Sequence, residues 1–183
     1  MPASSRTARL LSATPEPDGL RPYLFHGLDL TVGRTHGVGD CPFCDAGGKF
    51  SVDVESGLWR CWVCGGGQDS GGGNALTFLR TLHAAGAAPT PAAFLEDVAR
   101  DRRLCSAATA ASWGVCRSPL PPHPWLLAGY APDGRLDQVY KRAYMDGGWR
   151  LLPTPGVWPE GRGHALHLPA ADHGADRGAV LVC

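Results

Sequence analysis

The chain has 183 residues, and its 17 Lys and Arg balance 17 Asp and Glu, so the formal net charge at pH 7 is zero. This balance excludes a general basic footprint for nucleic acid, so any such contact must rest on local cations and aromatic rings. The 25 Gly and 16 Pro predict a loop-rich chain with small cores. No apolar stretch approaches the roughly twenty residues that span a bilayer, so we expect no membrane partner and a cytoplasmic location.

Residues 1–22 are expected to form a flexible N-terminal arm, because turn-forming residues cluster near the end of this segment. They are Pro15, Pro17, Asp18, Gly19 and Pro22. No apolar run follows Met1 that could serve as a secretion signal. An intracellular chain keeps its thiols reduced, which bears on the cysteines that come next.

Four cysteines form two pairs with the same spacing, Cys41 with Cys44 and Cys61 with Cys64, and sixteen residues separate the pairs. Two residues between the members of a pair let both sulfurs turn inward at one tight corner, so two such corners supply a tetrahedral thiolate site. Structural disulfides would need an oxidising compartment, and a redox-active pair would need a βαβ unit beside it. The spacing therefore predicts a closed structural Zn²⁺ site with no open position for catalysis.

The segment between the pairs has the pattern of a β-hairpin, with apolar residues at alternate positions of 49–54. These are Phe50, Val52 and Val54. Residues 55–57 supply the turn and 58–60 the returning strand. On that strand Trp59 shares one side with Cys61, and Arg60 shares the other with Trp62.

The rest of the chain divides into a helical part and a strand-rich part. Asn74 is expected to cap a helix over 75–85 that Gly86 ends, Thr90 and Pro91 to begin a second helix, and residues 106–113 to form a third. Strands are expected at 125–130, 136–145, 149–152 and 179–183.

The fold class predicted is α+β: a zinc ribbon, which is a small antiparallel sheet with a zinc site made of four cysteines, followed by short helices and a β-rich partial domain. The proposed divisions are a flexible arm (1–22), a zinc-ribbon domain with a packed helix (23–86), a helical linker (87–118) and a β-rich unit (119–183). The last boundary rests on the proline-rich stretch before Trp125.

The order of these features resembles the N-terminal zinc-binding domain of bacterial and phage DnaG-type primases. The residues that carry the resemblance are Cys-Pro-Phe-Cys at 41–44, Lys-Phe-Ser-Val at 49–52, the run from Trp59 to Gly65, a glycine-rich stretch, and Phe78 with Leu79. The family often has His where this chain has Cys44, and phage members with four cysteines are familiar. The later segments 133–135, 141–142, 164–168 and 179–183 are more loosely similar to the start of the family's toprim RNA polymerase core.

The resemblance implies a nucleotidyltransferase that makes short RNA primers on a single-stranded DNA template from ribonucleotides, with a replicative helicase as a further partner. In such enzymes the zinc domain helps to choose the initiation sequence, and toprim carboxylates hold Mg²⁺. This chain would carry the template-recognition part, and the carboxylates would follow Cys183. The chain alone is therefore not expected to make primers, and no catalytic residue is assigned in it.

Seven residues are candidates for contacting nucleic acid, since aromatic faces stack on bases and cations attract phosphates. They are Lys49, Trp59, Arg60, Trp62, Arg135, Lys141 and Arg142. Arg60 with Trp62 is the favoured exposed pair. The alternative function is a non-catalytic zinc-ribbon adaptor that binds nucleic acid or a protein, and a natural stop codon after Cys183 would favour it.

Overall fold

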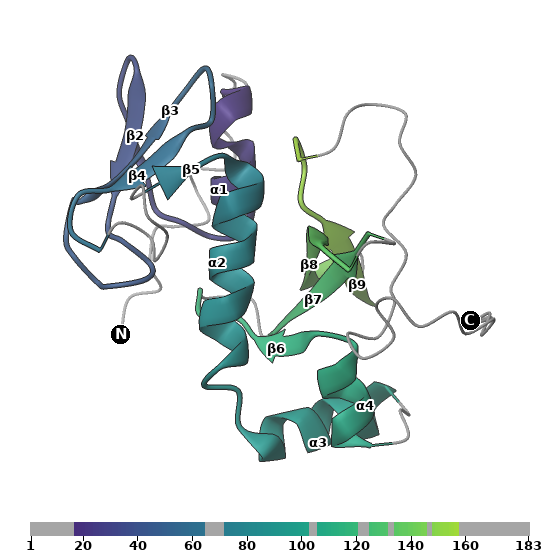
Figure 1. The fold of residues 1–183 in the computed structure, drawn as a ribbon. Helices are drawn as coiled ribbons and strands as arrows, with labels where there is room; N and C mark the ends of the chain where they lie inside the picture. Colours follow the sequence, from purple (N-terminus) through teal and green to yellow (C-terminus); the bar gives the residue numbers. More distant parts are fainter. Residues whose placement is uncertain are drawn as a thin grey trace, which may run out of the picture.

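The computed structural model describes residues 17–64, 72–102, 106–120, 125–131, 134–145 and 148–157. Two antiparallel sheets and several helices make the fold α+β. The long helix α2 (Ala75–Ala87) runs between the two sheets (Figure 1). The expected strand at 179–183 and the segment 164–168 lie outside the described residues.

The first sheet contains five strands in chain order, β1 (Thr31–Val32), β2 (His36–Gly39), β3 (Phe50–Asp53), β4 (Trp59–Cys61) and β5 (Gly72–Gly73). The hairpin of β3 and β4 is the one the alternation predicts, with Phe50 opposite Cys61 and Val52 opposite Trp59. These four side chains are buried, so one face of the hairpin lies in the core and the other faces solvent.

The segment before the first sheet corrects part of the expected flexible arm. Residues 18–20 form a short 3₁₀ helix, η2 (Asp18–Leu20), and α1 (Arg21–Phe25) follows at once. Leu20 and Tyr23 are fully buried, and the Tyr23 hydroxyl donates to the Gly57 carbonyl at 2.5 Å. Pro22 stands at the start of α1, where a missing N–H costs nothing, so the proline begins a helix here.

Helix α2 begins where the sequence predicts, because the Asn74 side chain accepts a hydrogen bond from Thr77 N at 3.0 Å. It continues past Gly86, at which the sequence predicts its end. A Cβ at Gly86 would collide with the Arg117 carbonyl and would lie 3.0 Å from Cys116 Sγ. The glycine therefore serves close packing between α2 and the next strand.

The remaining elements form a helical pair and a second sheet. The helices are α3 (Ala92–Arg102) and α4 (Ala107–Ser112), and Ser106 caps the latter. The four strands of the second sheet are also in chain order, β6 (Val115–Arg117), β7 (Trp125–Tyr130), β8 (Leu136–Met145) and β9 (Gly148–Pro153). The last three match the expected strands closely, whereas the sequence pattern does not predict β6.

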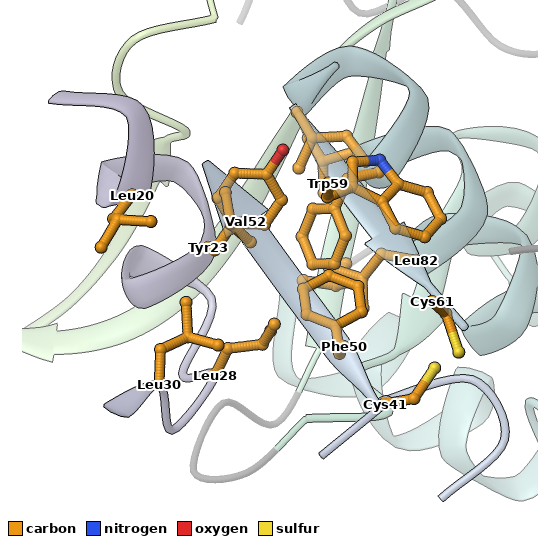
Figure 2. Close-up of a cluster of buried hydrophobic side chains, with 14 of the residues drawn as sticks. Leu20, Tyr23, Leu28, Leu30, Cys41, Phe50, Val52, Trp59, Cys61 and Leu82 are labelled. Atoms are coloured by element: carbon orange, nitrogen blue, oxygen red, sulfur yellow. The ribbon is translucent and has the colours of Figure 1, made fainter. Parts of the chain in front are cut away.

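One buried cluster connects both sheets through α2. Phe78, Leu79 and Leu82 of α2 are fully buried in it, together with residues of the first sheet and with Leu126 and Val139 of the second. Figure 2 shows Phe50 and Trp59 lying together in this cluster, and their rings stack at 5.3 Å between centroids. The packing thus continues across the boundary that the sequence suggested near residue 118.

Among the described residues, no helix has the length and apolar character needed to cross a membrane.

Candidate metal centre and adjoining sheet face

The four paired cysteines come together at one end of the β3–β4 hairpin. Cys61 ends β4, Cys64 lies in the turn after it, and Cys41 and Cys44 occupy the turn after β2. One sulfur from each residue lies within 4.8 Å of every other. The sulfur atoms of Cys41 and Cys61 face one another in Figure 2.

The spacing of the sulfurs fits a tetrahedral metal ion. Two contacts between the pairs measure 3.7 Å, from Cys41 Sγ to Cys64 Sγ, and 3.8 Å, from Cys44 Sγ to Cys61 Sγ. A Zn–S bond of about 2.3 Å in tetrahedral geometry places neighbouring sulfurs about 3.8 Å apart. Soft thiolates are ligands that zinc accepts readily, so the four cysteines are positioned to bind a structural metal ion.

Backbone N–H groups at both corners point at the sulfurs. Phe43 N lies 3.5 Å from Cys41 Sγ, and Val63 N and Cys64 N each lie 3.4 Å from Cys61 Sγ. Such donors stabilise a thiolate that carries negative charge. The glycine-rich stretch that follows Cys64, residues 65–71, lies outside the described part of the chain.

The two corners give their buried sulfurs different acidities. Burial raises the pKa of Cys41 well above its usual range. Burial also acts on Cys61, but hydrogen bonds from the N–H groups of Cys64 and Val63, together with those of the Cys41 and Cys64 thiols, outweigh it, and the pKa of Cys61 falls to about 7. Because metal binding requires thiolates, it must displace the proton that burial holds on Cys41.

Beside this centre, the solvent face of the first sheet presents an aromatic ring and a cation. Trp62 is 63% exposed, and the Arg60 guanidinium lies 4.2 Å from the centre of its ring. Lys49 is also exposed, and its carbonyl accepts a hydrogen bond from Trp62 N at 3.0 Å. These three residues therefore lie at one end of the β3–β4 hairpin, next to the cysteines.

Trp59 must be removed from the candidates for stacking on a base. It is only 3% exposed, and its indole N–H donates to the Asn74 carbonyl at 3.2 Å. Phe43, Phe50 and Phe78 surround its ring. The side chain belongs to the core that supports the cysteines.

Two of the three basic candidates in the second half of the chain are largely buried. Lys141 is 9% exposed, and its Nζ donates to the Phe25 carbonyl and lies over the Phe25 ring. Burial lowers the pKa of Lys141 to about 8. Arg142 pairs with Asp101 at 2.8 Å, and its side chain is 11% exposed. Arg135 alone of the three is exposed.

The structure also brings together polar residues that sequence reasoning missed. A shallow hollow of about 470 Å³ lies on the solvent face of the first sheet. Its lining includes Arg60 and Trp62 together with His36, Ser51, Asp53, Ser56, Leu58 and Trp59. Ser51 and Asp53 alternate with the buried Phe50 and Val52, so the same period that revealed the core could have placed them outside.

No protein-family model, curated protein or solved structure matches the chain. The fold and the site define a class of protein: an α+β protein whose four clustered cysteines can hold a metal ion beside an exposed sheet face.

Proposed function

We propose that the four-cysteine centre is a zinc ribbon and that the chain is the template-binding part of a DnaG-type primase. In this proposal zinc holds the two cysteine corners together, and the adjoining sheet face binds single-stranded DNA. Primer synthesis from ribonucleotides with Mg²⁺ is proposed for the whole primase, and the residues of this chain contribute the binding of the template.

The observation that carries the proposal is the exposed pair of Arg60 and Trp62 beside the metal centre. An exposed indole offers a face on which an unpaired base can stack, and such stacking is sequence-tolerant because every base has a π-face. The cation packed on the ring at 4.2 Å adds an attraction for phosphate. Leu58 and Val38 are exposed on the same face, which extends its apolar surface.

The balance of charge on this face sets the strength of binding that we expect. Arg60 and Lys49 are the exposed cations next to Trp62, while Asp53 and Glu55 lie nearby on the hairpin. Few phosphates can be neutralised, so binding should be weak and should fall only gently as salt rises. Stacking must then supply most of the affinity.

The test is a titration of fluorescently labelled single-stranded DNA of mixed sequence with the zinc-loaded chain, followed by anisotropy. Trp62→Ala should weaken binding about tenfold, the effect of losing one stacked base. Tyr144→Ala is the matched control, because Tyr144 is an equally exposed aromatic residue (62%) on the second sheet. It should leave the affinity unchanged.

A second pair of variants separates the local cation from general charge. Arg60→Ala should weaken binding, whereas Arg100→Ala, which removes an exposed cation on α3, should not. Equal losses within either pair, or no binding of the wild-type chain to any single strand, would contradict the proposal and favour the adaptor function.

A further inference from the structure

The solvent face of the first sheet contains a carboxylate. A surface that bound only the phosphate backbone would not be expected to include one. Asp53 lies on β3 in the hollow with Arg60 and Trp62. A carboxylate repels a phosphate backbone, but it is a good acceptor for the donor groups on a base edge. The position of Asp53 is therefore informative about what the face recognises.

The two oxygens of Asp53 have different surroundings. Oδ1 accepts three hydrogen bonds within the turn, from Glu55 N at 3.2 Å, from Ser56 N at 2.7 Å and from the Ser56 hydroxyl at 2.7 Å. Oδ2 lies 3.9 Å from His36 Nε2, which is beyond hydrogen-bond length. The Asp53 side chain is 34% exposed and Oδ2 accepts no hydrogen bond from the described residues, so Oδ2 can accept one from a ligand.

Asp53 is held in its ionised form by the same turn. The Ser56 N–H and hydroxyl, with a smaller contribution from His36, lower the pKa of Asp53 below its usual value. An ionised carboxylate can only accept hydrogen bonds.

Ser51 lies beside Asp53 with a free hydroxyl. The two residues are separated by one position on β3 and so share its solvent face, and Ser51 pairs with Arg60 across the hairpin. Within the part of the chain that the structure describes, the Ser51 hydroxyl has no hydrogen-bond partner. A hydroxyl can donate to a ring nitrogen while the neighbouring carboxylate accepts from an amino group.

We propose, building on the proposed function, that this face recognises an unpaired base by its Watson–Crick edge, where an exocyclic amino group lies beside a ring-nitrogen acceptor. This pattern selects cytosine or adenine over thymine, uracil or guanine. Asp53 Oδ2 accepts from the amino group, the Ser51 hydroxyl donates to the ring nitrogen, and the base stacks on the platform of Arg60 and Trp62. The face thus supplies one element of template sequence selection.

The excluded bases present the wrong pattern to these two residues. Uracil and thymine place carbonyl oxygens on both sides of their single N–H donor, and a carboxylate repels both oxygens. Guanine offers two adjacent donors, which suit two open carboxylate oxygens, but Oδ1 of Asp53 already accepts three hydrogen bonds. Cytosine and adenine each place an amino donor next to a ring-nitrogen acceptor, a pair of groups that the Asp53 carboxylate and the Ser51 hydroxyl can bind.

The experiment compares oligodeoxycytidine with oligodeoxyuridine of equal length at slightly alkaline pH, using the zinc-loaded full chain. These pyrimidines differ on this edge in the amino or carbonyl group and in the ring nitrogen beside it, which is an acceptor in cytosine and an N–H donor in uracil. Their rings are of equal size, so stacking is closely matched. The wild-type chain should bind the cytidine strand about fivefold to tenfold more tightly.

Two variants assign the preference to the carboxylate. Asp53→Asn keeps an oxygen for the Ser56 donors but places an NH₂ donor at the open position, so the preference for cytidine should vanish or reverse. Glu55→Gln also removes one negative charge, but Glu55 is two residues after Asp53 and does not line the hollow. This variant should keep the preference for cytidine. A third variant, Ser51→Ala, leaves the turn intact and should reduce the preference.

The outcomes separate this inference from the proposed function. Equal binding of both strands by the wild-type chain, or an unchanged cytidine preference in Asp53→Asn, would contradict the proposal that Asp53 selects the base. Neither result would contradict the proposed function. A failure to bind either strand would overturn both.

Discussion

Trp59 and Trp62 are three residues apart, yet they have opposite surroundings. Trp59 is enclosed by phenylalanines and has a hydrogen-bond partner for its indole N–H, whereas Trp62 stands in solvent beside Arg60. The side of the strand accounts for the difference, since Trp59 shares its side with Cys61. Residue type alone therefore does not distinguish a core aromatic from a binding aromatic, but strand alternation does.

The prediction at this scale concerns the cysteines. Cys61→Ser should abolish zinc binding and unfold the β3–β4 hairpin, because structural zinc contributes on the order of 10 kcal/mol, more than a small hairpin can replace by burial. Metal analysis and thermal unfolding measure both effects. Cys116→Ala is the control, because Cys116 is buried against α2 away from the centre and its variant should retain one zinc.

Freshly reduced wild-type protein without zinc would contradict this prediction. So would a Cys61→Ser variant that kept both its zinc content and its unfolding temperature.

At the scale of elements, α2 is the helix on which both sheets pack, and at Gly86 it lies directly against β6. Gly86→Ala should destabilise the protein by about 1–3 kcal/mol, because the added methyl group meets a backbone carbonyl that cannot move cheaply. The sign of the change in the free energy of unfolding is informative, because Gly→Ala at an uncrowded helix position stabilises a protein by about 0.4–1 kcal/mol. Denaturant unfolding measures the difference.

Ala84→Gly provides the baseline for that experiment. Ala84 is exposed on the same helix, so its loss should be the helix-propensity cost of about 1 kcal/mol. A stabilised Gly86→Ala variant would show that β6 yields to the methyl group and that the close approach is unimportant.

The elements that can be predicted from the sequence are those whose signals are local. The Asn74 cap, the hairpin and the long strands β7 and β8 are each marked by a cap, an alternation or a turn. The strands β1, β2 and β6 are missed because they are short and pair with residues that the local pattern does not reveal. The four cysteines are found from their spacing, whereas the roles of Asp53 and Lys141 depend on neighbours that only the fold brings close.

At the scale of the whole molecule, a buried polar contact joins α1 to the second sheet. The Thr154 hydroxyl donates to the Val139 carbonyl at 2.6 Å, so it must accept from Nε2 of the buried His26 at 2.7 Å. Gln138 holds Thr154 through two further hydrogen bonds of 3.2 Å to its backbone. The β-rich unit that the sequence predicts as a separate domain is thus tied to the N-terminal helix.

Thr154→Val tests this link. The valine has nearly the same shape but cannot serve His26 or Val139, so two buried polar groups lose a partner and the protein should lose about 1–3 kcal/mol of stability. Thr81→Val is the control, because the Thr81 hydroxyl bonds only within its own helix, to the Thr77 carbonyl. Its effect should stay within about 0.5 kcal/mol.

Equal and small effects of the two variants in urea unfolding would argue that the contact between α1 and the second sheet contributes little.

The position of α2 between two sheets has a consequence for how such a chain can be rearranged in evolution. His83 of α2 lies 2.8 Å from the Gly114 carbonyl and Arg80 reaches the Leu136 carbonyl, while Phe78 packs on Tyr23 and Trp59. A chain divided after α2 would expose the side of the helix that packs on the second sheet. A chain divided before α2 would expose the side chains of the first sheet that pack on the helix. The two sheets therefore depend on the same helix, and an exchange of the cysteine-bearing half alone would also have to supply a new surface for the helix to pack on.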